Sequence, residues 1–326
     1  MPQSSHSKLA RIPTPVAGLA LAIASLGWCL ENALPLGHHA QWTGAWIAAV
    51  MLLGLALKFI RHPRLLRDDL AHPVVGSVVP TAAMGWMVVS HSLGQWNALL
   101  GQGLWLLAIA MHMTFLACFI YHRVKGFALH HMVPSWFVPP VGLIVADVAF
   151  PGGAMRPLAE AIFYFGLLAY AVMLPAMLYR LIFCQNVPDL AKPTIAILAA
   201  PASLSLAGYL TVAEAPSMLL VGLLAGIAVL MTLLIYVAFL HLLRLPFNPG
   251  YAAFTFPMVI GATALFKLAH QLRLWGLAPD ELAWISQLAQ LELVIATLVV
   301  GYVSLRYLHH YRPSTTSPTP LHHSQQ

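Results

Sequence analysis

Runs of hydrophobic residues, each close to the length of a transmembrane helix, recur along the whole chain. A helix needs about 20 apolar residues to cross the hydrocarbon core of a bilayer. The runs therefore predict ten transmembrane helices, over residues 16–34, 42–60, 74–92, 98–121, 135–150, 158–182, 194–212, 217–243, 251–270 and 284–308. The fifth run is the shortest, and Pro139 and Pro140 interrupt it.

Residues 13–308 are expected to form one transmembrane domain between two short tails. The N-terminal tail covers residues 1–12, and the C-terminal tail covers residues 309–326, whose polar RPSTTSPTPLHHSQQ stretch predicts disorder. A cleavable signal peptide is an alternative interpretation of the first run, because Lys8 and Arg11 precede it and alternating alanines follow from Ala20. Cleavage would leave nine helices.

Composition supports a membrane protein and argues against several other classes. Of the 326 residues, 60% are hydrophobic and 8% are charged, whereas a soluble domain carries about 25% charged residues. The three cysteines, Cys29, Cys118 and Cys184, form no CxxC pair and indicate neither a disulfide framework nor a metal site. The common hydrolase, metalloprotease and nucleotide-binding motifs do not occur. The sequence therefore gives no positive argument for an enzyme, a metal or another cofactor.

The distribution of charge predicts the orientation in the membrane. With the N-terminus inside, thirteen of the sixteen Lys and Arg residues lie on the cytoplasmic side, as the positive-inside rule requires. The opposite side keeps Arg156, Lys267 and Arg273, together with most of the acidic residues. We therefore expect both termini in the cytoplasm and the chain in an inner or plasma membrane. Because the basic excess lies on short membrane loops, it does not indicate nucleic-acid binding.

Prolines recur at one depth in alternate hydrophobic runs. The third, fifth, seventh and ninth runs carry Pro80, Pro140, Pro201 and Pro257, spaced by 56–61 residues, and a further step back reaches Ala20 in the first run. A period of this size equals one helical hairpin, so ten helices predict five hairpins. A proline inside a helix frees a carbonyl group, and such backbone is tolerated in membranes where it is buried in protein or lines a water-filled cavity. We expect the odd helices to form a quasi-fivefold ring around a central pore and the even helices to surround them.

Short motifs at corresponding positions of the odd runs add a family resemblance. They are TPVAGLALA around Gly18, HPVVGS from His72 to Ser77, PSWFVPPVG from Pro134 to Gly142, LAAPASLS from Leu198 to Ser205, and FTFPM from Phe254 to Met258. From about Pro13 to Leu308, the chain resembles the tellurite-resistance protein TehA and the plant guard-cell slow anion channels, together with related dicarboxylate and sulfite permeases. The resemblance implies an anion-permeation fold and a homotrimer with one pore in each subunit. The chain departs from the family where Val16 and Ala17 replace the usual aromatic residue before the first glycine.

The odd runs contain the candidate pore residues. Over residues 16–30, 74–90, 135–146, 194–212 and 251–266 there is no Asp, Glu, Lys or Arg, and small residues are frequent. Small residues also permit close helix packing, so each candidate has a structural alternative. The candidate pore-lining residues are Gly18, Gly76, Ser77, Pro80, Pro139, Pro140, Pro201, Ser203, Thr255 and Pro257.

Phe256 is the candidate gate. It directly precedes Pro257 and matches the position at which the family resemblance implies a phenylalanine ring that plugs the pore. Because the odd runs offer mainly small side chains, we expect little else to fill the axis at that depth. Phe254 is about 200° away around the helix and is expected to point elsewhere.

An uncharged pore favours passive conduction of small anions. Coupled carriers usually need an intramembrane carboxylate or histidine as a relay, and the nearest candidates, Asp147 and His91, lie towards the outer ends of their runs. The alternative is a dicarboxylate or sulfite transporter of the tellurite-resistance type. A more remote alternative is a membrane haem or redox protein that uses His91 and His112, although axial ligands should lie at matched depth.

Two further interactions are expected within the membrane. His112 is predicted to make a hydrogen-bonded contact between helices rather than to bind a ligand. Glu292 and Lys267 lie on neighbouring runs of the last hairpin, and an ionisable residue at membrane depth usually pairs. They are therefore expected to form an ion pair.

Overall fold

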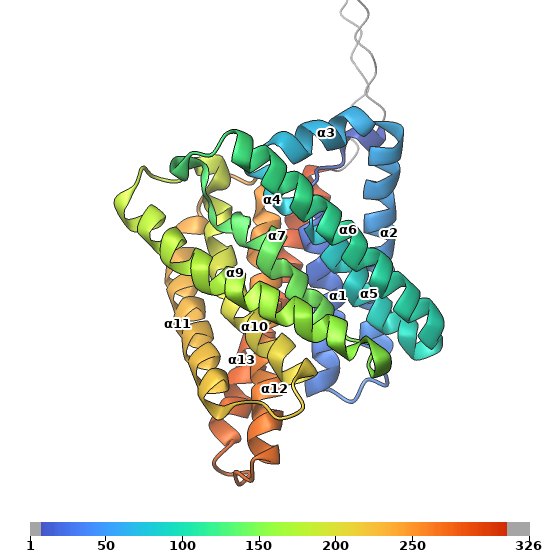
Figure 1. The fold of residues 1–326 in the computed structure, drawn as a ribbon, viewed down its shortest axis with the longest axis vertical. Helices are drawn as coiled ribbons and strands as arrows, with labels where there is room; N and C mark the ends of the chain where they lie inside the picture. Colours follow the sequence, from blue (N-terminus) through green and yellow to red (C-terminus); the bar gives the residue numbers. More distant parts are fainter. Residues whose placement is uncertain (1–7, 312–326) are drawn as a thin grey trace, which may run out of the picture.

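The computed structural model describes residues 8–311, and every regular element in this part is helical (Figure 1). Eight of its helices are long and apolar enough to cross a membrane. They are α1 (Val16–Ala33), α2 (His39–Arg61), α6 (Ala98–Lys125), α9 (Arg156–Phe183), η6 with α10 (Asp189–Ala199, Ala200–Val212), α11 (Met218–Leu242), η7 with α12 (Pro249–Phe254, Thr255–Leu274) and α13 (Ala283–His310).

A ninth crossing follows if a bent pair of helices is counted as one. Helix α3 (Pro63–Ala71) meets α4 (Val75–Val78) and α5 (Thr81–Trp96) at an angle of 105°. Helix α3 lies across the end of the molecule in Figure 1 and has no buried residue. The sequence analysis placed no helix there, although the proline after His62 is a helix-start signal.

The fifth predicted helix is a short and irregular segment. It consists of η3 (Pro134–Phe137), α7 (Val138–Val141), η4 (Gly142–Ile144) and α8 (Val145–Val148). Pro139 and Pro140 lack N–H groups and prevent a continuous α-helical ladder. Side chains of α6 satisfy two of its carbonyl groups. His112 Nε2 donates to the Pro139 oxygen at 2.8 Å, and Trp105 Nε1 donates to the Ala146 oxygen at 2.9 Å. The predicted role of His112 as a helix contact is confirmed.

Burial divides the crossing helices into two classes. The buried share of residues is 83% for η6–α10, 78% for η7–α12 and 56% for α1, whereas it is 28–33% for α2, α6, α9, α11 and α13. Segments α5 and α7–α8 are also mainly buried. Each buried segment therefore alternates along the chain with an exposed helix, whose apolar side chains are suited to contact with lipid.

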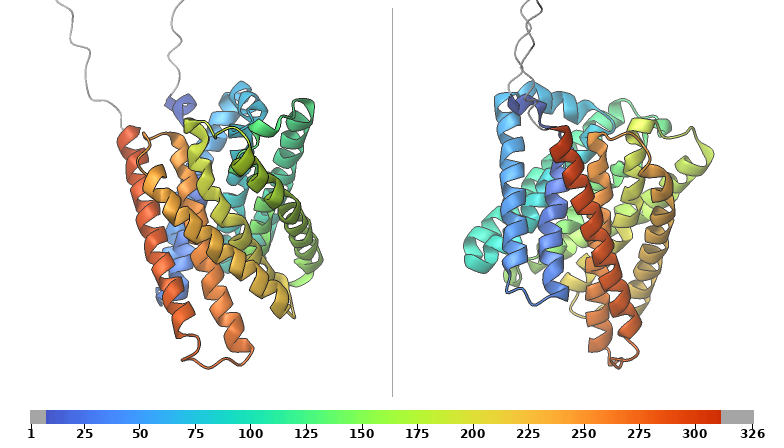
Figure 2. Two further views of the ribbon diagram at one scale, coloured as in Figure 1. Left: turned by 90° about the vertical axis from the view of Figure 1, so that its left-hand side faces the viewer. Right: turned by 180° about the vertical axis from the view of Figure 1, so that it is seen from behind.

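The contacts follow the same alternation. Each buried segment packs against the exposed helix that follows it, as α1 does with α2, α5 with α6 and α12 with α13. Among themselves, the buried segments are also in contact: α1 with α5 and α12, α8 with α5 and α10, and α10 with α12. Figure 2 shows the exposed helices around this group, and the first and last described residues lie at the same end of the molecule.

The recurring prolines lie at helix starts rather than within α-helices. Pro201 is the second residue of α10 and follows η6, Pro257 is the third residue of α12 and follows η7, and Pro80 directly precedes α5. In the first turn a backbone N–H has no partner within the α-helix, so a proline costs little there. The expectation of kinks inside α-helices is therefore wrong, and these prolines mark the change from a tighter turn or 3-10 helix to an α-helix.

Two hairpins pack their helices through glycine. In the α5–α6 hairpin, a methyl group built on Gly101 would lie 2.4 Å from the Gly94 Cα atom. In the α1–α2 hairpin, one built on Gly27 would lie 2.4 Å from the Ala40 oxygen. Contacts of this kind bring helix backbones close together in membranes, where packing drives association.

We expect Gly101→Ala to destabilise the protein. Its methyl group would press against backbone, which cannot move away without separating α5 from α6, so a loss of about 1–3 kcal/mol or more is expected. Gly103→Ala is the matched control, because nothing lies within 4 Å of a methyl group there. Thermal melting of both purified variants in detergent measures the difference. Equal melting temperatures would show that this close packing is dispensable.

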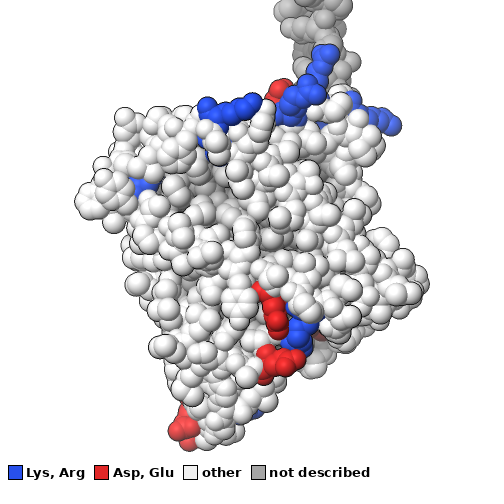
Figure 3. Space-filling view, viewed as in Figure 1, with Lys and Arg blue, Asp and Glu red and all other residues white. Residues whose placement is uncertain are grey.

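Charged residues gather at the two ends of the molecule. Figure 3 shows Lys and Arg mainly at the end near the chain termini, and Asp and Glu towards the opposite end, with a broad uncharged band between them. Some basic residues have structural roles. The fully buried Arg180 donates to the carbonyl oxygens of Gln185 and His130 at 2.6 and 3.0 Å, which ties two loops together.

Candidate functional site: the central cavity

A cavity of about 330 Å³ lies among the starts of the five buried segments. Every one of these segments contributes to its wall. The residues that line it include Pro15, Gly18 and Leu21 from the first, Val78, Thr81 and Met84 from the second, Phe137, Val141 and Gly142 from the third, Thr194, Pro201 and Leu204 from the fourth, and Asn248, Ala252, Phe256 and Pro257 from the fifth. The cavity therefore occupies the common centre of the buried segments.

Four predicted site residues meet at this cavity. Gly18, Pro201, Phe256 and Pro257 all contribute to its wall. Gly18 has no side chain and so leaves room for the cavity. A methyl group built on Gly18 would lie 3.6 Å from the Ala252 Cβ atom, which is an ordinary contact distance. These four residues come from α1, α10 and α12.

The other predicted residues lie outside this wall. Ser77 is buried and donates to Ser135 Oγ at 2.7 Å, whereas Ser203 and Thr255 donate to backbone carbonyl groups at 3.0 and 2.7 Å. Gly76 packs closely against the Leu70 oxygen. Pro80, Pro139 and Pro140 belong to the buried segments but do not line the cavity.

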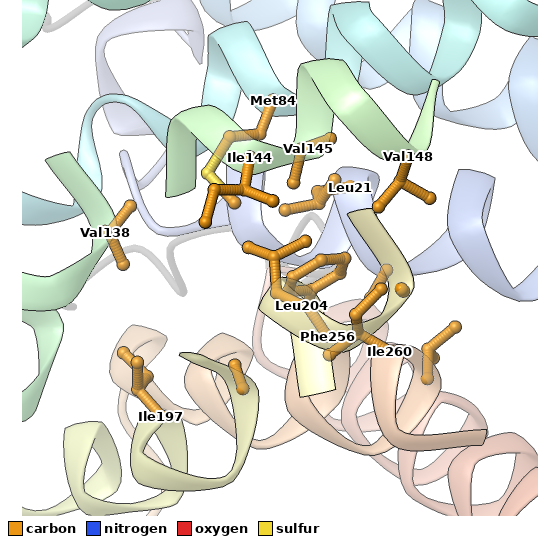
Figure 4. Close-up of a cluster of buried hydrophobic side chains, with 14 of the residues drawn as sticks. Leu21, Met84, Val138, Ile144, Val145, Val148, Ile197, Leu204, Phe256 and Ile260 are labelled. Carbon is orange, nitrogen blue, oxygen red and sulfur yellow. The ribbon is translucent and has the colours of Figure 1, made fainter. Parts of the chain in front are cut away.

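The Phe256 side chain lines the cavity and is largely buried. Only 8% of the residue is exposed. Figure 4 shows the ring among converging apolar side chains, which include Leu21 from α1, Ile144 from η4, Leu204 from α10 and Ile260 from α12. The expectation that little else fills the axis is wrong, since several large side chains from different buried segments surround the ring. We call this apolar cluster the constriction.

Phe254 packs in a different place. It is fully buried, and its ring centroid lies 5.4 Å from that of Phe239 on α11 and 4.7 Å from that of Tyr251. It does not line the cavity. The two phenylalanines of the FTFP motif therefore occupy different environments, as the helical register predicted.

Among the described residues, none that lines the cavity is charged. Three of its polar side chains are used locally: Thr81 and Thr194 donate to carbonyl groups of their own segments, and Asn248 accepts from the Gly250 N–H. The N-terminal ends of α1, α4, η6 and η7 lie at the cavity, which Pro15, Val75, Leu190 and Pro249 help to line. The N-terminal end of a helix carries partial positive charge, and together these ends favour an anion over a cation.

Comparison with known proteins places this architecture in a family. The family model described as voltage-dependent anion channel matches residues 12–308. The chain belongs to the voltage-dependent anion channel family. The resemblance seen in the sequence is thereby confirmed, and the chain is a multi-pass membrane protein of a transport family.

Two archaeal relatives in Methanocaldococcus jannaschii are named as uncharacterized transporters. One is 27% identical over 235 residues, which cover 64% of this chain and 68% of the relative. The other is 27% identical over 236 residues, which cover 64% of this chain and 67% of the relative. Both names agree with a transport function and specify no substrate.

The buried ionisable residues of this family member lie away from the cavity. Asp147 on α8 is fully buried, and neither carboxylate oxygen has a hydrogen-bond partner among the described residues. Glu292 on α13 packs against Gly261 of α12. The ion pair expected between Glu292 and Lys267 is absent from the ion pairs within residues 8–311. That expectation is wrong because helical rotation, not hairpin partnership, decides which side chains meet.

The two histidines of the haem alternative are engaged elsewhere. His112 Nε2 is bonded to Pro139, and the ring of His91 stacks on Trp28 with centroids 3.9 Å apart. Within the described part of the chain, no group of three His, Cys, Asp or Glu residues could hold a metal ion. The positions of these histidines give no support to axial haem ligation.

Sequence reasoning missed the large apolar residues of the constriction. Leu21, Met84 and Leu204 line the cavity beside Phe256. Leucine and methionine are ordinary in hydrophobic helices, so their type carried no signal. Their position, three residues beyond Gly18, Thr81 and Pro201, was the available clue, because residues at that spacing share a helix face.

Proposed function

We propose that the protein is a passive channel for small anions, with one conduction path along the axis enclosed by the five buried segments. The observation that carries the proposal is the cavity to which all five segments contribute, whose lining among residues 8–311 is uncharged and includes Phe256. In this arrangement ten helices cross the membrane as five hairpins. Segment 134–148 counts as one crossing because α6 satisfies part of its backbone.

The position of the chain ends supports an even number of crossings. The first and last described residues lie at one end (Figure 2), and that end is rich in Lys and Arg (Figure 3). By the positive-inside rule it is the cytoplasmic end. We therefore propose that both termini face the cytoplasm of an inner or plasma membrane and that the cavity opens to the cytoplasm.

The physical character of the cavity favours anions that bind weakly. The helix starts and the basic residues at the cytoplasmic end raise the local anion concentration. Conduction requires that an ion also leaves easily, and an apolar wall provides no strong partner. Closure follows from the apolar constriction, since a narrow hydrophobic passage excludes water and ions together.

Phe256 is proposed as the main gating side chain. It has the largest ring at the constriction shown in Figure 4 and joins the cavity wall to the packed side chains beyond it. A change of its rotamer would open the path without moving a helix. Leu204 and Met84 are proposed to narrow the same passage.

A dicarboxylate or sulfite transporter of the tellurite-resistance type is the second candidate. Proteins usually bind carboxylates through Arg or Lys side chains, and Arg does so in a bidentate manner. The cavity wall has neither residue, which favours small inorganic anions. The proposal involves no catalysed reaction and no cofactor.

The family resemblance further implies a homotrimer, and we propose that three copies assemble side by side with a separate pore in each. The exposed helices offer many large apolar side chains for contact with lipid or with other copies. Crosslinking in membranes, read as the mass of the largest discrete product, tests this part.

Flux into liposomes tests the function. Purified protein is reconstituted, and efflux of chloride, nitrate, sulfite and malate is compared in one assay, with potassium as the cation. We expect chloride and nitrate to move and potassium and malate to be excluded. Saturable malate or sulfite uptake without chloride flux would instead support the carrier.

A further inference from the structure

The constriction continues outward along three helices into a group of polar and aromatic side chains. Leu21, Met84 and Ile260 belong to the constriction in Figure 4 and come from α1, α5 and α12. Seven residues further along each helix stand Trp28, His91 and Lys267. A step of seven residues returns to the same helix face within about 20° and rises about 10 Å.

Two of the three side chains are in contact, as this register requires. The rings of Trp28 and His91 are stacked, with centroids 3.9 Å apart and planes inclined by 21°. Lys267 lies on the same face of α12 as Ile260, two turns further along the helix. Helix α1 packs against both α5 and α12, so the three positions belong to neighbouring helices around the common interior.

Lys267 has no counter-ion in the described structure. None of the ion pairs and side-chain hydrogen bonds within residues 8–311 involves its ammonium group. Glu31 is the carboxylate at the outer end of α1, and it accepts N–H groups from His38, Ala40 and Gln41.

The three side chains are not fully buried. Trp28, His91 and Lys267 are each partly exposed, although most residues that precede His91 on α5 and Lys267 on α12 are buried. A charged group at membrane depth usually pairs or faces a water-filled cavity. An unpaired, partly exposed ammonium group on the pore face of α12 is therefore suited to meet a mobile anion.

We propose that Lys267, on the inward face of α12 two turns beyond the constriction, forms an anion-binding site at the outer end of the pore, which selects small inorganic anions as they leave or enter. This site rests on the proposed conduction path and deepens it. The path is then neutral in its cytoplasmic half and carries one positive charge beyond the constriction. The ammonium group supplies the attraction for the anion.

Binding and conduction test the site separately. Thermal melting of the purified protein is measured while nitrate replaces gluconate at constant ionic strength. Wild type and Lys267→Arg should be stabilised by nitrate, and Lys267→Met should lose that response. An equal nitrate response in Lys267→Met, or none in wild type, would overturn the site.

Conductance is then compared in the Phe256→Ala background. At an ionic strength of about 10 mM, where the screening length is about 30 Å, Lys267→Met should lower chloride conductance roughly threefold or more. At about 1 M, where the screening length is about 3 Å, the difference should largely disappear. Lys267→Arg should keep the conductance, and unchanged conductance of Lys267→Met in dilute salt would contradict the site. Lysine-dependent nitrate binding without flux in any variant would uphold the site and reject the channel.

Discussion

Phe256→Ala is expected to increase chloride flux through the protein by roughly tenfold or more. In the proposed path the ring blocks passage beyond the cavity, and each ~1.4 kcal/mol removed from a barrier to passage speeds it about tenfold. Leu204 lines the same cavity and lies near the ring in Figure 4. The double variant Phe256→Ala/Leu204→Ala should therefore conduct more than either single variant. Efflux from chloride-loaded liposomes measures all three.

Phe254→Ala is the matched control from the same motif. Phe254 packs against Phe239 and Tyr251 away from the cavity, so its truncation should cost about 3–5 kcal/mol of stability and leave chloride flux at the wild-type level. Phe254→Leu retains more of the packing if the alanine variant does not assemble. Wild-type flux together with a large loss of stability in Phe256→Ala would mean that Phe256 only packs the core.

Gly18→Trp is expected to abolish the flux that Phe256→Ala allows. Gly18 lines the cavity beside Ala252, and an indole side chain there would fill much of a space of about 330 Å³. The large effect follows because the proposed path has no alternative route around α1. The measurement is chloride efflux from liposomes that contain the double variant Gly18→Trp/Phe256→Ala.

Gly18→Ala provides the comparison at the same position. Its methyl group would reach only an ordinary contact of 3.6 Å with Ala252, so flux should stay near that of the background. Thermal melting shows whether the tryptophan variant remains folded. A folded Gly18→Trp variant with full flux would place the anion path somewhere other than this cavity.

Hydrophobic runs and residue types predicted much of the helical architecture. Apolar length is a direct physical requirement of the bilayer, so the long exposed helices were found within a few residues of their bounds. The 60-residue proline period also marked the buried segments correctly. Helix α3 was missed because its mixture of charged and apolar residues matches no transmembrane pattern. The prolines were assigned to the middle of α-helices because the sequence does not distinguish a segment that starts as a 3-10 helix from one that starts as an α-helix.

The site was only partly predictable for a related reason. Gly18, Pro201, Phe256 and Pro257 were found through motifs, whereas Leu204 shares the constriction without a distinctive residue type. The expected pairing of Glu292 with Lys267 was wrong because contacts across helices depend on rotations that a single sequence does not specify.

The reversal potential of the current through Phe256→Ala tests passive anion conduction most directly. Under a tenfold chloride gradient in a planar bilayer, the current should reverse near the chloride equilibrium potential, about 59 mV from zero. An additional proton or sodium gradient should leave that potential unchanged, because passive conduction follows the anion's own electrochemical gradient. A reversal potential that follows the proton, sodium or potassium gradient would contradict the account.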